Sequence, residues 1–379
     1  MKMIVAQPYL NLMGGAEKVV LNIAQHYDAK IYTLEYKPST TFEGFRNLDV
    51  EIIGKKIPLS EHLPYRASQG LNYGFNFYNL KVKEDYDLIN AHISPSEWIR
   101  HKNERVLWYC HTPPREVYDL YATRMKNRSY KQKVLYAVLA SSYRFVASNI
   151  VKQIEGIATN SENTRSRIMK NFSRNAAVIN PGVDYKEFYN KGAEKFFLYP
   201  SRIIPNKRQD FAIDAFAKFV RKSGLKNYKL IIAGALSKDK EHQQYFEKLK
   251  SKNVPGVAFK VNVGEKELHN LMSRCTAVLF AAINEDFGYV PVEAMASSKP
   301  VISIAEGGPS ETVVNGKTGY LVNSPEEMAD KMQYVVEHPD VAEQMGAEGR
   351  KRVIEKYSWE SFFRKFDRLA TKVAKGGSF

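Results

Sequence analysis

Short apolar runs recur along the chain, and longer stretches with helical periodicity separate them. The runs do not alternate with polar residues, which is typical of strands buried on both faces of a parallel sheet. In the first half we expect strands at Met3–Gln7, Val50–Ile53, Asp87–Ala91, Arg105–Cys110, Ile154–Thr159 and Ala176–Asn180. In the second half we expect them at Phe196–Tyr199, Tyr228–Gly234, Val257–Val261, Ala277–Ala282 and Val301–Ala305.

The stretches between these runs carry the faces and start signals of helices. Apolar residues at helical spacing predict two of them. One has the face Val19, Val20, Ile23, Ala24 and Tyr27, and the other has the face Leu268, Leu271, Met272 and Cys275. Ser161 and Ser324 are expected to cap two further helices. Strands and helices in alternation predict an α/β protein with doubly wound parallel sheets.

The chain is expected to divide near Asn180-Pro181-Gly182, which is strong turn chemistry. We therefore predict a Rossmann-like acceptor-side domain at residues 1–183 and a Rossmann-like donor domain at residues 184–357. A closing amphipathic helix at residues 358–379 is expected to pack back on the first domain. Two such domains would face each other across a cleft, with ligands at the carboxyl ends of their strands.

Composition and charge narrow the class of protein. The chain has 379 residues, of which 44% are apolar and 26% charged, as in folded soluble proteins. Its net charge of +15 favours anionic partners, and the absence of any nucleic-acid-binding fingerprint argues against nucleic acid. Cys110 and Cys275 lie in different predicted domains, so we expect no disulfide and a cytoplasmic location. No long uninterrupted apolar run predicts a membrane span, so the protein is expected to be soluble or peripheral.

The strongest candidate motif runs from Glu285 to Glu293. It places a carboxylate after a strand, then a turn with Gly288, and then a helix that carries the second carboxylate. Amides at a helix start suit hydroxyls or phosphate, and Gly288 permits close approach of the backbone. The alternative is a solvated loop carboxylate and an ordinary glutamate near a helix start.

A basic loop follows the predicted strand Phe196–Tyr199 and contains Arg202 and Lys207. A departing nucleotide diphosphate gains negative charge, which a guanidinium fork and an ammonium group can neutralise without a metal ion. The alternative is a solvated basic turn.

Weaker signals come from the first half of the chain. Gly14 and Gly15 stand between the first strand and the first helix, where they would permit phosphate or sugar to approach the backbone. His111 ends the strand Arg105–Cys110 and would hydrogen-bond a sugar, although a lone histidine is more often structural. Asp85 and Asp87 have the D-x-D form of some metal-dependent transferases, but they precede a strand, so we predict no metal site.

Together these residues resemble the retaining glycosyltransferases of the glycogen-synthase-like family four, which have the two-domain GT-B fold. The resemblance extends from Gly14-Gly15 through the Glu285/Glu293 pair to the closing helix. The stretch Cys110-His111-Thr112-Pro113-Pro114-Arg115 is similar to a mannosyltransferase-like branch, which suggests GDP-mannose as the donor.

The resemblance also implies roles for the candidate residues. Glu285 and His111 would contact the sugar, and Glu293 would hold the ribose. Arg202 and Lys207 would bind the diphosphate. The backbone around Phe287, Gly288 and Tyr289 would face the sugar, and the loop with Val263 would touch the nucleotide base. Retention of configuration is implied, with the nucleotide sugar as co-substrate and no further cofactor.

The acceptor is left open between a glycan and a polyprenyl-linked glycan. Basic residues between Arg124 and Lys133 precede an apolar helix, which would rest on an anionic membrane or simply pack into the domain. Rival functions are a silent nucleotide-sugar-binding or membrane scaffold protein, or another GT-B enzyme such as an epimerase.

Overall fold

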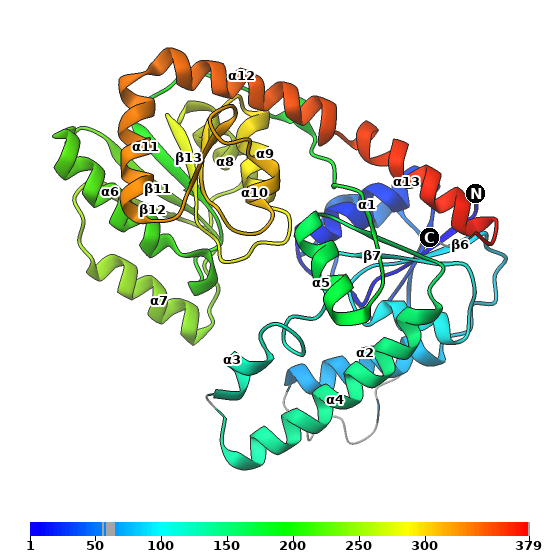
Figure 1. The fold of residues 1–379 in the computed structure, drawn as a ribbon. Helices are drawn as coiled ribbons and strands as arrows, with labels where there is room; N and C mark the ends of the chain where they lie inside the picture. Colours follow the sequence, from blue (N-terminus) through cyan, green and yellow to red (C-terminus); the bar gives the residue numbers. More distant parts are fainter. Residues whose placement is uncertain (55–56, 58–64, 127, 378–379) are drawn as a thin grey trace. The chain divides into compact units, whose positions relative to one another are not determined.

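The structure is a computed structural model that describes residues 1–54, 57, 65–126 and 128–377. The chain divides into two compact units (Figure 1). The first unit is Met1–Asn180 with Phe363–Phe379, and the second is Pro181–Phe362. Residues 181–183 group with the second unit, where the amide of Val183 donates to the carbonyl of Tyr357 at 2.8 Å.

The sheet of the first unit is parallel and, in the described residues, has the strand order β5-β3-β1-β6-β7-β8-β9. The order reverses between β1 and β6, which makes the gap between their carboxyl ends the switch point of the sheet. Its strands are β1 (Met3–Ala6), β3 (Lys30–Thr33), β5 (Val50–Ile52), β6 (Leu88–Ala91), β7 (Val106–Cys110), β8 (Gly156–Thr159) and β9 (Ala177–Val178), and β2 (Tyr9–Leu10) pairs separately with β4 (Glu35–Tyr36).

Helices cover this sheet and begin where the sequence provides caps. The hydroxyl of Ser161 accepts a hydrogen bond from the amide of Thr164, as expected of an N-cap. The final segment of the chain also packs here, because the rings of His26 and Phe363 stack at 3.9 Å between centroids. The helices are α1 (Gly15–Tyr27), α2 (Tyr65–Asn79), α3 (Tyr121–Lys126), α4 (Tyr130–Gln153), α5 (Glu162–Phe172) and the end of α13 (Trp359–Ala374), with short 3-10 turns η1 (Glu43–Asn47) and η3 (Ser96–His101).

The second unit holds another parallel sheet, with the order β12-β11-β10-β13-β14-β15 among its described strands. This is the Rossmann order, and its switch point lies between β10 and β13. The strands are β10 (Phe196–Pro200), β11 (Lys229–Gly234), β12 (Val257–Val261), β13 (Ala277–Phe280), β14 (Val301–Ile304) and β15 (Gly319–Val322).

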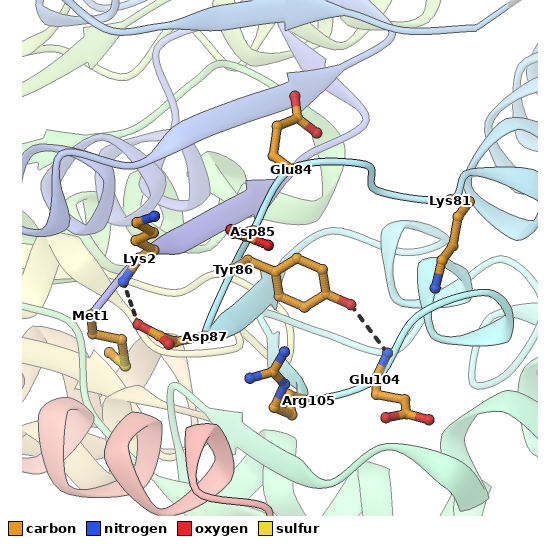
Figure 2. Close-up of a pocket in the computed structure, with 9 residues that line it drawn as sticks. All are labelled: Met1, Lys2, Lys81, Glu84, Asp85, Tyr86, Asp87, Glu104 and Arg105. Carbon is orange, nitrogen blue, oxygen red and sulfur yellow. Dashed lines mark hydrogen bonds between the residues drawn. The ribbon is translucent and has the colours of Figure 1, made fainter.

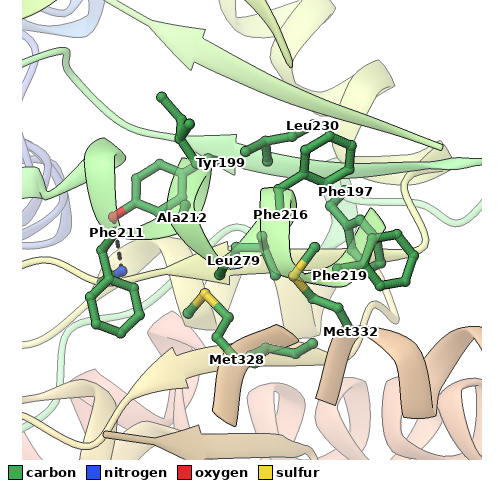
Figure 3. Close-up of a cluster of buried hydrophobic side chains, with 14 of the residues drawn as sticks. Phe197, Tyr199, Phe211, Ala212, Phe216, Phe219, Leu230, Leu279, Met328 and Met332 are labelled. Carbon is green, nitrogen blue, oxygen red and sulfur yellow. Dashed lines mark hydrogen bonds between the residues drawn. The ribbon is translucent and has the colours of Figure 1, made fainter. Parts of the chain in front are cut away.

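One face of the second sheet is covered by an aromatic and sulfur-rich core (Figure 3). Phe216 and Phe219 of α6 meet Met328 and Met332 of α11 there, and all four side chains are fully buried. The helices are α6 (Gln209–Ser223), α7 (Lys240–Ser251), α8 (Glu265–Arg274), α9 (Tyr289–Ala296), α10 (Pro309–Thr312), α11 (Pro325–Glu337) and α12 (Pro339–Lys356), with the 3-10 turns η4 (Tyr185–Glu187) and η5 (Pro205–Lys207).

The predicted strands all form, with ends that differ by at most two residues. The largest difference is at Ala176–Asn180, where only Ala177 and Val178 pair with β8. The side chain of Asn180 instead donates to the carbonyl of Asn160 at 2.9 Å, and Pro181 has no amide to continue the ladder. The sequence did not predict β3, β15 or the two-residue strands β2 and β4.

Candidate active site

The basic loop and the acidic motif of the second unit meet at the switch point of their sheet. Lys207 follows β10, and Glu285 follows β13, which is the neighbouring strand. The Nζ atom of Lys207 lies 2.6 Å from Oε2 of Glu285. The lysine side chain is 13% exposed and the glutamate side chain 29% exposed, so the pair is largely shielded from water. The structure thus brings together two residues that lie 78 positions apart in the sequence.

A buried tyrosine fixes the two loops to each other. The hydroxyl of Tyr199, on β10, accepts a hydrogen bond from the amide of Ala281 at 2.8 Å, which is the dashed line in Figure 3. The same hydroxyl donates a hydrogen bond to the carbonyl of Lys207. A second link joins the amide of Ile283 to the carbonyl of Asn206 at 2.9 Å. The backbone that carries Lys207 is therefore tied to the end of β13.

Arg202 lies in the same basic loop. Its side chain is exposed, and its guanidinium has no ion pair or side-chain hydrogen bond to the described residues. Its backbone is held by Gln209, whose Nε2 donates to the hydroxyl of Ser201 and to the carbonyl of Arg202, both at 2.8 Å. The loop also approaches Gly234 so closely that a Cβ there would lie 1.9 Å from the carbonyl oxygen of Ser201.

Two glycines pack against the backbone of the acidic motif that runs from Glu285 to Glu293. Gly308 donates its amide to the carbonyl of Glu285 at 2.8 Å. A Cβ on Gly307 would lie 2.5 Å from the same carbonyl oxygen, and one on Gly308 would lie 2.3 Å from the carbonyl of Phe287. The Gly307-Gly308 loop therefore packs directly on the backbone of the motif, which only residues without a side chain allow.

The rest of the motif divides between core and surface. The ring of Phe287 is buried against Tyr289 and Tyr357, so only its backbone remains for a ligand. Gly288 has a φ of +86° and precedes α9, and Glu293 lies on α9 and is partly exposed. The first amides of a helix have no partner within the helix, which makes this end of α9 suited to hydroxyl or phosphate oxygens.

Val263 lies at the same edge of the sheet, in the loop after β12. The preceding Asn262 has a φ of +56°, and its side chain accepts a hydrogen bond from the amide of Leu236 at 3.0 Å. This contact ties the loop after β12 to the loop after β11. Val263 itself is partly buried against the core.

In the first unit, His111 is paired with a histidine that the sequence did not single out. His92 directly follows β6 and is fully buried, and its Nδ1 lies 3.1 Å from Nε2 of His111. Burial lowers the pKa of His111 to about 3 and holds the pKa of His92 well below its ordinary value. Both rings are therefore neutral at physiological pH, so one nitrogen donates and the other accepts. One feature of the sequence could have identified His92 as a candidate, which is its position directly after a buried strand.

Gly14 is the N-cap of α1, which begins at Gly15 in the segment that follows β1 and β2. A Cβ on Gly14 would lie 2.5 Å from Oε2 of Glu17 and 2.7 Å from a methyl carbon of Leu12. Glu17 is buried in the first turn of α1, where a carboxylate interacts favourably with the helix dipole. The glycine at position 14 thus makes room for a buried carboxylate, which the sequence did not indicate.

Asp85 and Asp87 of the D-x-D sequence lie at the amino ends of the strands, at the opposite edge of the first sheet. Figure 2 shows them in a surface hollow lined by charged residues. Asp87 accepts a hydrogen bond from the amide of Lys2 at 2.7 Å, which anchors the beginning of the chain. Among the described residues, no group of three or more His, Cys, Asp or Glu side chains is arranged to hold a metal ion.

Two doubly wound units, each with polar residues at its switch point, define a class of α/β proteins that bind ligands at the carboxyl ends of parallel strands. Comparison with known proteins identifies the family. Residues 13–187 match the profile of Glycosyltransferase Family 4, and residues 184–352 match that of Glycosyl transferases group 1. The chain therefore belongs to the glycosyltransferases of family four and has the GT-B fold.

Individual relatives are similar over almost the whole chain. The alpha-1,3/1,6-mannosyltransferase ALG2 of Dictyostelium discoideum is 25% identical, with 95% of this chain and 96% of that protein covered. The human enzyme of the same name is 27% identical, with 95% and 94% covered. In structure, HepE of Anabaena, solved in complex with UDP-glucose, superposes with a TM-score of 0.72 at 18% identity and covers 98% of this chain and 100% of that one. The chain is thus a glycosyltransferase similar to mannosyltransferases.

Proposed function

We propose that the protein transfers mannose from GDP-mannose to a glycan or polyprenyl-linked acceptor, with retention of configuration and without a metal ion. The similarity to mannosyltransferases supports the choice of sugar. The observation that carries the proposal is the contact between Lys207 and Glu285 at the switch point of the second sheet, with the exposed Arg202 in the same loop as Lys207. A sugar diphosphate offers negative charge to the two cations and hydroxyls to the carboxylate.

In this proposal the two cations take the role that a metal ion has in other transferases. Arg202 is unpaired among the described residues and is the first cation to meet the diphosphate. Lys207 then exchanges its contact with Glu285 for a phosphate oxygen. The developing charge on the leaving diphosphate is stabilised by both groups, in a setting where little reorganisation is needed. Glu285 becomes available to accept hydrogen bonds from sugar hydroxyls.

The remaining candidate residues have assigned roles in the same reaction. The backbone at Phe287, Gly288 and Tyr289 faces the sugar, Glu293 binds the ribose, and the loop with Val263 borders the base. His111 hydrogen-bonds the transferred sugar as a neutral imidazole. The bond from the anomeric carbon to the phosphate oxygen breaks, and the bond to the acceptor oxygen forms on the same face. The acceptor's proton passes to the departing phosphate oxygen.

A donor screen tests the proposal. The purified protein is incubated in EDTA with GDP-mannose, UDP-glucose and UDP-GlcNAc, and nucleotide release and thermal stabilisation are measured. We expect selective release of GDP, and Arg202→Ala is expected to lower the rate about 10²–10³-fold. Arg221→Ala is the matched control, because Arg221 is exposed in the last turn of α6, away from the loops.

Three results would contradict the proposal. Selective use of a uridine donor would overturn the choice of GDP-mannose. A product with inverted anomeric configuration, determined by NMR, would overturn retention. Failure to bind or turn over any nucleotide sugar would favour a silent scaffold protein.

A further inference from the structure

Helix α4 of the first unit has an unusual composition for the surface of a folded domain. It runs from Tyr130 to Gln153 and contains no Asp or Glu. By length and hydropathy it is the one described helix that could cross a membrane, yet only 22% of its apolar window is buried. A core helix with this hydropathy would be mostly covered. The exposed apolar surface of α4 therefore requires an explanation.

Five large apolar side chains of α4 are exposed, and all of them except Leu135, which is 40% exposed, lie in one stripe. The four residues of the stripe are Tyr130, Val134, Val138 and Phe145, with exposed fractions of 82%, 48%, 58% and 71%. At about 100° per residue, these four positions fall within a sector of roughly 80°. We call this set the α4 stripe. Scattered apolar residues are normal on a surface, but large apolar residues gathered on one side of a helix mark a contact surface.

Positive charge surrounds the α4 stripe. From Tyr121 to Gln153 the sequence holds no acidic residue and has basic residues at Arg124, Lys126, Arg128, Lys131, Lys133, Arg144 and Lys152. The nearest preceding carboxylates are already neutralised, because Glu116 pairs with Arg124 at 2.7 Å and Asp119 pairs with Arg115 at 2.9 Å. An apolar stripe beside uncompensated lysines is complementary to an anionic lipid surface.

The opposite side of α4 is fixed to the first unit. Ala140, Ala147, Ile150 and Val151 are buried in it. Arg144 donates from Nε to the carbonyl of Val117 at 2.6 Å, and the hydroxyl of Tyr136 donates to the carbonyl of Glu116. Insertion of α4 across a bilayer would break these contacts. The helix is therefore placed to lie in the plane of the membrane interface.

We propose that the α4 stripe docks the first unit on an anionic phospholipid bilayer, with Lys131 and Lys133 at the level of the headgroups. The apolar side chains enter the interface, and the lysines add electrostatic attraction. Each contribution is modest, so binding is reversible and weakens as salt is raised. The docking rests on the composition and exposure of α4 alone and does not depend on the donor.

Vesicle flotation tests this proposal with the full chain. The protein is mixed at low salt with vesicles of phosphatidylcholine alone or with one third phosphatidylglycerol. We expect binding to the anionic vesicles, little binding to the neutral ones, and release at high salt. The variant Val138→Ser/Phe145→Ser is expected to reduce the bound fraction about tenfold, and Lys131→Gln/Lys133→Gln is expected to remove the preference for anionic lipid. Ile354→Gln is the control, because Ile354 is an exposed apolar residue on α12 in the other unit.

Folding of each variant is checked by its thermal midpoint and by release of nucleotide from a soluble donor, which should be unchanged. Equal binding of wild type and Val138→Ser/Phe145→Ser would overturn the proposal, as would failure to bind anionic vesicles at low salt. A dimer in light scattering that the same double variant dissociates would assign the α4 stripe to a second copy of the chain instead.

Discussion

Replacement of Tyr199 by phenylalanine tests whether the two loops of the second unit are held as the structure indicates. The change removes one hydroxyl and leaves the ring, which is fully buried and stacks on Phe280 with centroids 6.3 Å apart. Burial raises the pKa of Tyr199 far above its ordinary value, so the hydroxyl donates at every accessible pH. Without it, the amide of Ala281 and the carbonyl of Lys207 lose their partner.

The cost follows from the two groups left without a hydrogen bond. A buried polar group that loses its partner destabilises a protein by about 1–3 kcal/mol. The carbonyl of Lys207 lies in a loop and can relax toward water, whereas the amide of Ala281 is buried. We therefore expect Tyr199→Phe to lower the free energy of unfolding by about 2–4 kcal/mol. Since the loop that carries Lys207 is released from β13, the turnover rate should also fall, by roughly tenfold to a hundredfold.

Urea unfolding and steady-state kinetics with a saturating acceptor measure the two effects. Tyr245→Phe is the control, because the hydroxyl of Tyr245 is partly exposed and bonds to Asp210 of α6, donating to its carboxylate at 2.8 Å and accepting from its amide at 3.4 Å. It should cost about 1 kcal/mol and leave turnover intact. If Tyr199→Phe were as stable and active as wild type, the hydroxyl would have no part in holding Lys207, and the argument from its hydrogen bonds would be wrong.

Three further changes probe other buried contacts. Burial raises the pKa of Glu97 to about 8 from 4.5, so wild type takes up a proton on folding and loses stability as the pH rises through that window. Glu97→Gln should remove this loss. Measured by urea unfolding, the free energy of unfolding of the variant relative to wild type should increase by roughly 3 kcal/mol from pH 4.5 to 7. Equal pH dependence of the two proteins would contradict this. His92→Leu removes the hydrogen bond that orients His111, so turnover should fall about tenfold with little change in donor affinity, and the ¹⁵N spectrum of His111 should show mixed tautomers; an unchanged spectrum would count against it. Gly234→Ala should displace the loop of Arg202 and weaken nucleotide binding in calorimetry by about tenfold, whereas Gly70→Ala, on α2 of the first unit with open space around the added carbon, should bind as wild type does.

The sequence predicted the elements of the fold that depend on local pattern. Apolar runs located the central strands, and the caps at Ser161 and Ser324 form as expected. The strands β3 and β15 were missed although they are as long as β1 and β6, with four residues each. Their apolar runs are weaker, because β3 contains Lys30 and Thr33 and β15 begins at Gly319, and their pairing is decided by distant neighbours. Pairing across a sheet is a tertiary property, and a single sequence carries it weakly.

The candidate site shows the same division between local and distant information. The motif at Glu285 and the basic loop could be located because each follows a strand. The residues that position these two loops could not be located, because in the sequence Tyr199 looks like an ordinary core residue and Gln209 like an ordinary helix residue. Their polar atoms acquire a role only when strands far apart in sequence become neighbours, as β10 and β13 do. The direct contact between Lys207 and Glu285 was hidden for the same reason.

The pairing of Lys207 with Glu285 explains how a largely buried cation is maintained at this site. A lysine with 13% of its side chain exposed loses much of its hydration, and a carboxylate at 2.6 Å offsets that loss. An isolated buried pair adds little to stability, so we interpret the arrangement as a site whose charged side chains are positioned before a ligand binds. In the proposed reaction, an incoming anion replaces the carboxylate as partner of the lysine and meets Arg202, which carries no competing partner among the described residues. The proposal therefore assigns the net attraction for the anion to Arg202, and the directional contacts to Lys207 and Glu285.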